Sequence, residues 1–157
     1  MRIGIVSDTH DRILPELFRA LAGVDEILHA GDVCTAEALA EIEVIAPVTA
    51  VHGNMDERAL FERLPEERRL ERGGFTIALL HGHRARRGRL EDFVTRYRDS
   101  SPDLVVFGHS HEPLSEAVQG TRYFNPGTAG GIGRSPTAGI LTIEDGELAV
   151  RHVELAG

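Results

Sequence analysis

Short apolar runs alternate with helical patterns in the first third of the chain. Three runs rich in Ile, Val and Leu predict buried strands: Ile3–Ser7, Glu26–Ala30 and Val48–Val51. After the first run, Pro15 fits the first turn of a helix with apolar residues on one face. Thr35 is a plausible cap for a second helix, which Pro47 ends. This βαβαβ order predicts a parallel sheet with right-handed crossovers.

The rest of the chain has a different pattern. Two strand-like runs flank a Gly73-Gly74 turn and predict a hairpin, Arg68–Gly73 with Phe75–Leu80. Arg89–Arg98 carries apolar residues at helical spacing, and Leu104–Phe107 predicts another buried strand. Only strands are expected from Leu114 onward: Leu114–Val118, Arg122–Phe124, Thr137–Ile143 and Glu147–Val153. We therefore expect one domain over residues 1–157, an α/β fold in which two mixed sheets form a sandwich flanked by helices.

Composition narrows the class of protein. A length of 157 residues and a hydrophobic content of 41% suffice for a buried core without disulfides, and a single cysteine, Cys34, excludes an internal one. No run approaches the roughly 18 apolar residues of a membrane helix, and the chain starts directly with a strand-like run, so we expect a cytoplasmic protein without a signal peptide. The net charge of −8 argues against stable nucleic-acid or membrane binding. All 17 basic residues are arginine, which excludes a lysine Schiff base.

Five short segments rich in Asp, Asn or His stand where a predicted strand ends. We call them the donor segments: Asp8-Thr9-His10, Gly31-Asp32, Gly53-Asn54, His81-Gly82-His83 and Gly108-His109-Ser110-His111. In open α/β sheets ligands gather outside the carboxyl ends of the strands, so these segments are expected to converge. Oxygen and imidazole ligands without thiolates suit divalent metals such as Mn, Fe, Ni or Zn. The pattern predicts an enzyme with two metal ions.

The order Asp-x-His, Gly-Asp, Gly-Asn, His, Gly-His-x-His resembles that of the calcineurin-like metallophosphoesterases, over roughly Met1 to His152. The short length, Gly-Asn-Met-Asp at 53–56 and Asn125-Pro126-Gly127-Thr128 resemble a narrower branch. That branch comprises small bacterial and archaeal phosphodiesterases, which share their fold with the non-catalytic retromer scaffold subunit.

The resemblance implies a ligand set for two divalent ions. Asp8, His10 and His111 would hold the first ion, Asn54, His81 and His109 the second, and Asp32 would bridge both. A bridging carboxylate allows two ions to lie about 3.5–4 Å apart and to generate a hydroxide that attacks phosphorus. The catalytic group would then be Asp32, Asn54 and His109, with Asn54 also contacting substrate. Manganese is the preferred metal, with nickel, iron or zinc as alternatives.

Met55 is a departure from the wider family, which usually has a histidine after the asparagine, thought to protonate the leaving group. A thioether cannot donate a proton, and loss of a general acid costs about a hundredfold to ten-thousandfold for a poor leaving group. A small phosphodiester with a good leaving group is therefore the expected substrate, and His83 is an alternative proton donor. The other hypotheses are a non-catalytic protein-binding scaffold and a phosphomonoesterase or nucleotide phosphatase. A homo-oligomer is possible, because exposed sheet edges often pair.

Several further residues have less specific interpretations. His29 is expected to be a half-buried core residue, His152 a surface residue, and Cys34 a packed thiol rather than a ligand. His52 fits either a supporting role or exposure. Asp11 and Asp56 are expected to cap helices or to orient the ligands.

An arginine cluster directly after His81 allows one prediction. A charge run usually forms a solvated face, but guanidinium groups bind phosphate bidentately, so Arg86 and Arg87 can form a phosphate clamp. A clamp predicts that Arg86→Ala with Arg87→Ala raises KM for an anionic diester, measured by steady-state hydrolysis. Kinetics that stay unchanged at low salt would leave the solvated face as the interpretation.

Overall fold

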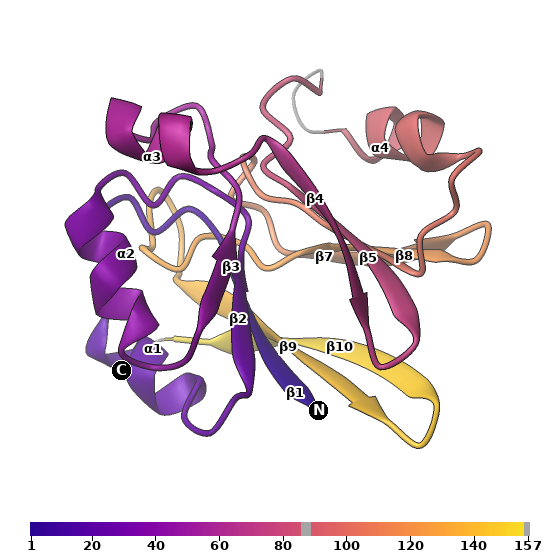
Figure 1. Ribbon diagram of the computed structural model, residues 1–157, viewed down its shortest axis with the longest axis horizontal. Coiled ribbons are helices and arrows are strands. Elements are labelled where there is room, and N and C mark those ends of the chain that lie inside the picture. The colour runs from indigo at the N-terminus through magenta and orange to yellow at the C-terminus, as the bar shows by residue number, and fades with distance from the viewer. Residues whose placement is uncertain (86–88, 156–157) are drawn as a thin grey trace.

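The computed structural model describes residues 1–85 and 89–155, in which two five-stranded sheets face each other (Figure 1). Arg86 and Arg87 lie outside the described residues. In chain order the elements are β1 (Arg2–Val6), α1 (Pro15–Ala20), β2 (Glu26–His29), α2 (Ala36–Glu43), β3 (Val48–Ala50), α3 (Arg58–Arg63), β4 (Glu67–Arg72), β5 (Phe75–Leu80), α4 (Leu90–Tyr97), β6 (Leu104–Val106), β7 (Leu114–Val118), β8 (Thr121–Asn125), β9 (Thr137–Glu144) and β10 (Glu147–Glu154).

The first sheet has the strand order β10-β9-β1-β2-β3. Strands β1, β2 and β3 are parallel, because α1 and α2 return the chain to the same end of the sheet each time. Strands β9 and β10 form an antiparallel hairpin that pairs with β1 on its other side. The predicted βαβαβ start is confirmed, with α1 beginning at Pro15 and Thr35 capping α2 through its side chain.

The second sheet has the order β4-β5-β6-β8-β7. Its three inner strands are parallel, and antiparallel strands β4 and β7 form the edges. The prediction of a two-sheet α/β sandwich with mixed sheets is therefore confirmed.

Three apolar clusters hold the layers together. Apolar side chains of both sheets, such as Ile5 and Phe124, pack face to face between the sheets. The two sheets approach closely at Gly139 of β9, where a Cβ atom would lie 2.5 Å from the Phe124 ring. Helices α1, α2 and α3 contribute to a second cluster on the first sheet, and α4 covers the second sheet with Phe93 stacked on Phe107. No helix of the described residues is long and apolar enough to cross a membrane.

Helix α3 was not predicted from the sequence. It has six residues, no side chain that caps its N-terminus, and one buried residue, Leu60, so it shows no helical periodicity. Its position is set by packing, because Leu60 and Leu64 join the cluster beneath α2.

Candidate metal centre

The five donor segments lie at one edge of the sandwich, directly after β1, β2, β3, β5 and β6. Backbone hydrogen bonds join neighbouring segments within each sheet. Asp8 N–H donates to Gly31 O at 3.0 Å, and Gly108 N–H donates to His81 O at 3.1 Å. The predicted convergence of strand ends is therefore present in both sheets.

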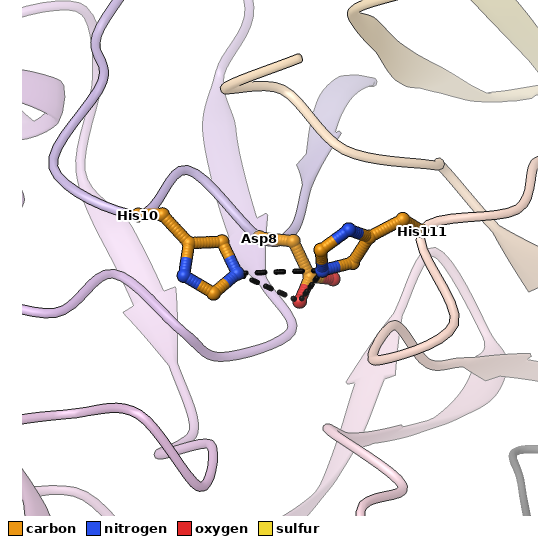
Figure 2. A group of neighbouring side chains, drawn as sticks. All are labelled: Asp8, His10 and His111. Carbon is orange, nitrogen blue, oxygen red and sulfur yellow. Dashed lines mark hydrogen bonds and ion pairs between the residues drawn. The ribbon is translucent and has the colours of Figure 1, made fainter. Parts of the chain in front are cut away.

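Asp8 stands at the centre of the cluster and is fully buried (Figure 2). Its Oδ2 accepts hydrogen bonds from Ser7 Oγ at 2.6 Å and from the backbone N–H of His109 at 3.0 Å. Its Oδ1 faces three Nε2 atoms, those of His111 at 3.3 Å, His10 at 3.6 Å and His81 at 3.8 Å. Within the described part of the chain, this buried oxygen has no hydrogen-bond partner.

The carboxylate of Asp32 lies between two of the same imidazoles. Its Oδ2 is 3.2 Å from His81 Nε2 and 3.6 Å from His10 Nε2, and its Oδ1 accepts from the backbone N–H of Met55 at 2.9 Å. The side chain of Asn54 completes this part of the cluster, with Oδ1 at 3.1 Å from His81 Nε2.

Backbone carbonyls orient two of the histidine rings. His81 Nδ1 donates to Ala30 O at 2.7 Å, and His111 Nδ1 donates to Ile132 O at 3.1 Å. In each neutral ring, Nε2 then presents its lone pair to the carboxylate oxygens. Lone pairs of nitrogen and oxygen repel each other unless a cation lies between them. The donor set and the unpaired Asp8 Oδ1 therefore fit a divalent metal ion.

Two groups of donor atoms have a spacing suitable for an ion, with all atoms in each group within 4.8 Å of one another. They are Asp8, His10 and His111, and Asp8, Asp32 and His81. The family resemblance implies that only Asp32 is shared by both ions, whereas here Asp8 belongs to both groups of donor atoms as well. His109 lies beside them, its ring centroid 5.2 Å from that of His81.

The histidines of the cluster favour the ionised form of its two buried carboxylates. Burial alone would raise the pKa of Asp8, but the imidazoles of His10 and His111 hold it well below its usual range when their Nε2 atoms carry a proton and donate to it. Burial likewise opposes ionisation of Asp32, and the His81 side chain lowers the pKa of that carboxyl. Both carboxylates are thus ionised at neutral pH and can act as metal ligands.

The backbone at these donor residues has an unusual conformation. Positive φ angles of 47–69° occur at five donor residues: Asp8, His10, Asp32, His109 and His111. Such angles are uncommon for residues other than glycine and cost roughly 1–3 kcal/mol each. The strain places these side chains on the same side of the strand ends, where they form the cluster.

Asp56 holds two of the donor segments in place. Its carboxylate accepts backbone N–H groups of Asp32 at 3.2 Å, Cys34 at 2.7 Å and Gly53 at 2.6 Å. Asp56 was expected either to cap a helix or to orient the ligands, and these hydrogen bonds agree with the second role. Asp11 instead accepts from Thr35, the cap of α2.

The turn at Asn125 supports the site from the second sheet. Asn125 Nδ2 donates to Gly108 O at 3.1 Å and to Ser110 Oγ at 3.0 Å. His152, which was expected at the surface, is partly buried: its Nε2 donates to Asn125 O at 2.8 Å and its ring stacks on Phe124. This contact joins β10 to β8, and nothing local in the sequence indicates it.

The remaining predicted residues lie around the cluster. His83 is half-buried, with its ring centroid 5.6 Å from that of His81, and its Nδ1 has no hydrogen-bond partner among the described residues. His52 is buried and packs against Phe61. Cys34 is partly buried, with Sγ 3.7 Å from His10 Nδ1.

Two contributors were missed by the sequence analysis. Ser7 donates to Asp8 Oδ2, and Thr128 Oγ1 donates to Asp8 O at 2.8 Å. A serine or threonine at a strand end is too common to indicate either role.

Residues 1–146 match the family described as calcineurin-like phosphoesterase superfamily domain. A probable metallophosphoesterase of Methanothermobacter thermautotrophicus is 37% identical over 147 residues, which cover 90% of this chain and 81% of that protein. A phosphodiesterase of Methanocaldococcus jannaschii is 32% identical, covering 94% of this chain and 96% of its own. Vps29 of Entamoeba histolytica, solved with Zn²⁺, has a similar fold with a TM-score of 0.81 and 24% identity, covering 99% of this chain and all of that one.

The role of Asp56 leads to a prediction. Asp56→Ala should weaken Mn²⁺ binding about ten- to hundredfold in calorimetric titrations, because the segments carrying Asp32 and Asn54 lose their shared hydrogen-bond acceptor. Asp103→Ala is the matched control, since Asp103 also accepts a backbone N–H, from Thr76 at 2.8 Å, next to the opposite end of β6. Equal affinities for both variants would contradict the positioning role.

His29 leads to a second prediction. The ring is fully buried, and its Nδ1 accepts the N–H of Gly31 at 3.1 Å. Burial lowers the pKa of His29 to about 4, so the unfolded chain binds the proton first as pH falls below about 6.5. Stability is then lost as the pH falls from about 6.5 to 4. The variant His29→Asn retains a hydrogen-bond acceptor but does not titrate. In the metal-free protein, the free energy of unfolding by urea should therefore fall between about pH 6.5 and 4 by up to about 3 kcal/mol less in this variant than in the wild type. Parallel curves for the two proteins would contradict this.

Proposed function

The chain belongs to the calcineurin-like phosphoesterase superfamily, and on this premise we propose that it is a divalent-metal-dependent phosphodiesterase acting on small diesters. The observation that carries the proposal is the buried Asp8 Oδ1, which faces three imidazole nitrogens and has no partner among the described residues. The related phosphodiesterase of Methanocaldococcus jannaschii supports the reaction class.

We assign the ligands as the family pattern suggests. Asp8, His10 and His111 would hold one ion, Asn54, His81 and His109 a second, and Asp32 both, with manganese as the proposed metal. When bound, such a pair supplies a hydroxide nucleophile and neutralises charge on the phosphoryl oxygens. No protein nucleophile is then needed.

The chain's own residues have three tasks in this reaction. The carbonyls of Ala30 and Ile132 fix the rings of His81 and His111, so that their Nε2 atoms stay aimed at the ligand cluster. Asp56 holds the segments of Asp32 and Asn54. The exposed Asn54 side chain borders the solvent, where it can donate to a phosphoryl oxygen.

The preference for diesters rests on the residue after Asn54. Met55 is 58% exposed and presents no proton donor to the solvent side of the site. Diesters with a good leaving group need no such donor, whereas monoesters with a poor one do. His83 remains the proposed proton donor for other substrates. Because the protein has a net charge of −8, its substrate is expected to be a small molecule in the cytoplasm rather than a nucleic acid.

A scaffold without catalysis is the second candidate function. The likeness to Vps29, a vacuolar protein sorting protein, favours it. Against it, all seven residues of the family's ligand pattern are present in this chain and lie together. A scaffold has no need of buried, ionised carboxylates facing histidines.

Metal reconstitution tests the proposal. Metal-stripped protein should regain hydrolysis of bis(4-nitrophenyl) phosphate on addition of Mn²⁺, with little turnover of 4-nitrophenyl phosphate. Asp32→Ala should lower the restored rate at least about a hundredfold, since it removes a direct ligand. Asp99→Ala, which removes an exposed carboxylate after α4, is the control and should keep the wild-type rate.

Two outcomes would overturn this assignment. Absence of turnover of either ester with Mn²⁺, Ni²⁺, Fe²⁺ or Zn²⁺ would favour the scaffold. Faster hydrolysis of the monoester would identify a phosphomonoesterase.

A further inference from the structure

Strand β10 is the longest of the four strands that form the edges of the two sheets. Its eight residues pair with β9 in one continuous register from Glu147 to Glu154, without a bulge (Figure 1). The strand contains no proline or lysine, residues that often keep a sheet edge from pairing with another chain. Its other side has no partner strand in the described part of the chain. We call this free side the β10 edge.

The backbone of the β10 edge presents unused hydrogen-bonding groups at every second residue. Leu155, which directly follows β10, donates its N–H to Pro136 O across the hairpin. Because the backbone groups of a strand alternate between its two sides, those of the other odd-numbered residues of β10 also point toward β9. The groups of Leu148, Val150 and His152 therefore point outward, and no described backbone group outside the hairpin bonds to them. A second strand can be added here through main-chain hydrogen bonds.

The side chains of β10 suit a strand that continues the sheet. On the face toward the second sheet, Leu148 and Val150 are partly buried at the border of the apolar layer. On the other face, Glu147, Ala149 and Arg151 are exposed. The ion pairs among the described residues leave both Glu147 and Arg151 without a partner. Two opposite charges on one face are thus available to another chain.

The side chains of β10 are self-complementary in one antiparallel register. In a symmetric antiparallel pair the two-fold axis passes through one residue, because residues that lie opposite each other point to the same face. An axis at Ala149 sets Glu147 of each copy opposite the partner's Arg151. It also sets Leu148 opposite the partner's Val150, so that the outward backbone groups of these residues meet. Axes at Leu148 or Val150 would set Glu147 opposite an alanine or a valine.

The other three edges offer no such match. Strand β3 has only three residues. On β4, Glu67 and Arg72 already form ion pairs within the chain. On β7, Glu116 is the one charged residue, so a symmetric pair of β7 strands sets it opposite itself or an uncharged side chain. The β10 edge is therefore the best suited of the four to a second copy of the chain.

We propose that the β10 edge joins two copies of this chain into a symmetric dimer, with Ala149 of both copies at the two-fold axis. The two five-stranded first sheets then form one continuous sheet, with two Glu147–Arg151 pairs between the copies. Opposite charges on neighbouring strands stabilise the pairing, whereas like charges oppose it. The contact is short, so the dimer is expected to dissociate on dilution. The inference is independent of the proposed function, because it uses none of the candidate metal ligands.

Sedimentation equilibrium at chain concentrations up to about 1 mM tests the inference. The wild-type protein should show a monomer–dimer equilibrium. Glu147→Arg and Arg151→Glu should each weaken the dimer about ten- to hundredfold, because each change turns two attractive pairs into repulsive ones. The double variant, Glu147→Arg with Arg151→Glu, should recover the wild-type dissociation constant, since opposite charges again face each other.

A matched control separates this pairing from a general effect of charge. Glu116→Arg makes the same change of net charge as Glu147→Arg, at an exposed residue of the β7 edge. It should keep the wild-type dissociation constant. Circular dichroism checks that each variant is folded.

An engineered disulfide tests the position of the axis. The backbone groups of Ala149 point toward β9 in both copies, and the Cα atoms of such a non-hydrogen-bonded pair are about 4.5 Å apart. A disulfide spans this separation. Ala149→Cys should therefore form a covalent dimer in a glutathione redox buffer. Val44→Cys, at a residue that is 77% exposed after α2, is the control and should stay monomeric.

Any of four results would overturn the inference. The first is a wild-type protein that stays monomeric over the whole concentration range. The second is a single charge variant that dimerises like the wild type, or a Glu116→Arg variant that loses the dimer to the same extent. The third is a folded double variant that does not recover the dimer. The fourth is an Ala149→Cys variant that is crosslinked no more than Val44→Cys.

Discussion

The buried carboxylate of Asp8 is the constraint on which the rest of the site depends. Burial disfavours its negative charge, and Ser7 together with the backbone of His109 satisfies only one of its oxygens. The other oxygen lies near the Nε2 atoms of three imidazoles. When these rings are neutral, the nitrogens direct their lone pairs at the oxygen. Divalent cations between these groups would satisfy them, because the donor atoms form two sets with metal-site spacing. Five donor residues have positive φ angles, a strained backbone conformation that accompanies this arrangement of side chains.

The sandwich provides this arrangement because its two sheets end at the same edge. Asp8, His10 and Asp32 follow strands of the first sheet, and His81 and His111 follow strands of the second. The apolar contact between the sheets therefore sets the distances among the ligands. Asp56, in the loop after β3, and Asn125, at the end of β8, hold the donor segments locally through hydrogen bonds to their backbone.

The sequence by itself determined the strands, the mixed sandwich and the donor segments. These features are local, because apolar runs identify strands, and parallel strand ends meet at one edge. Only the tertiary structure decided the rest. Helix α3 has too few residues to show a period, and His152 reaches Asn125 from 27 positions away. Such contacts depend on which elements pack together, and that is set by the whole core rather than by any segment.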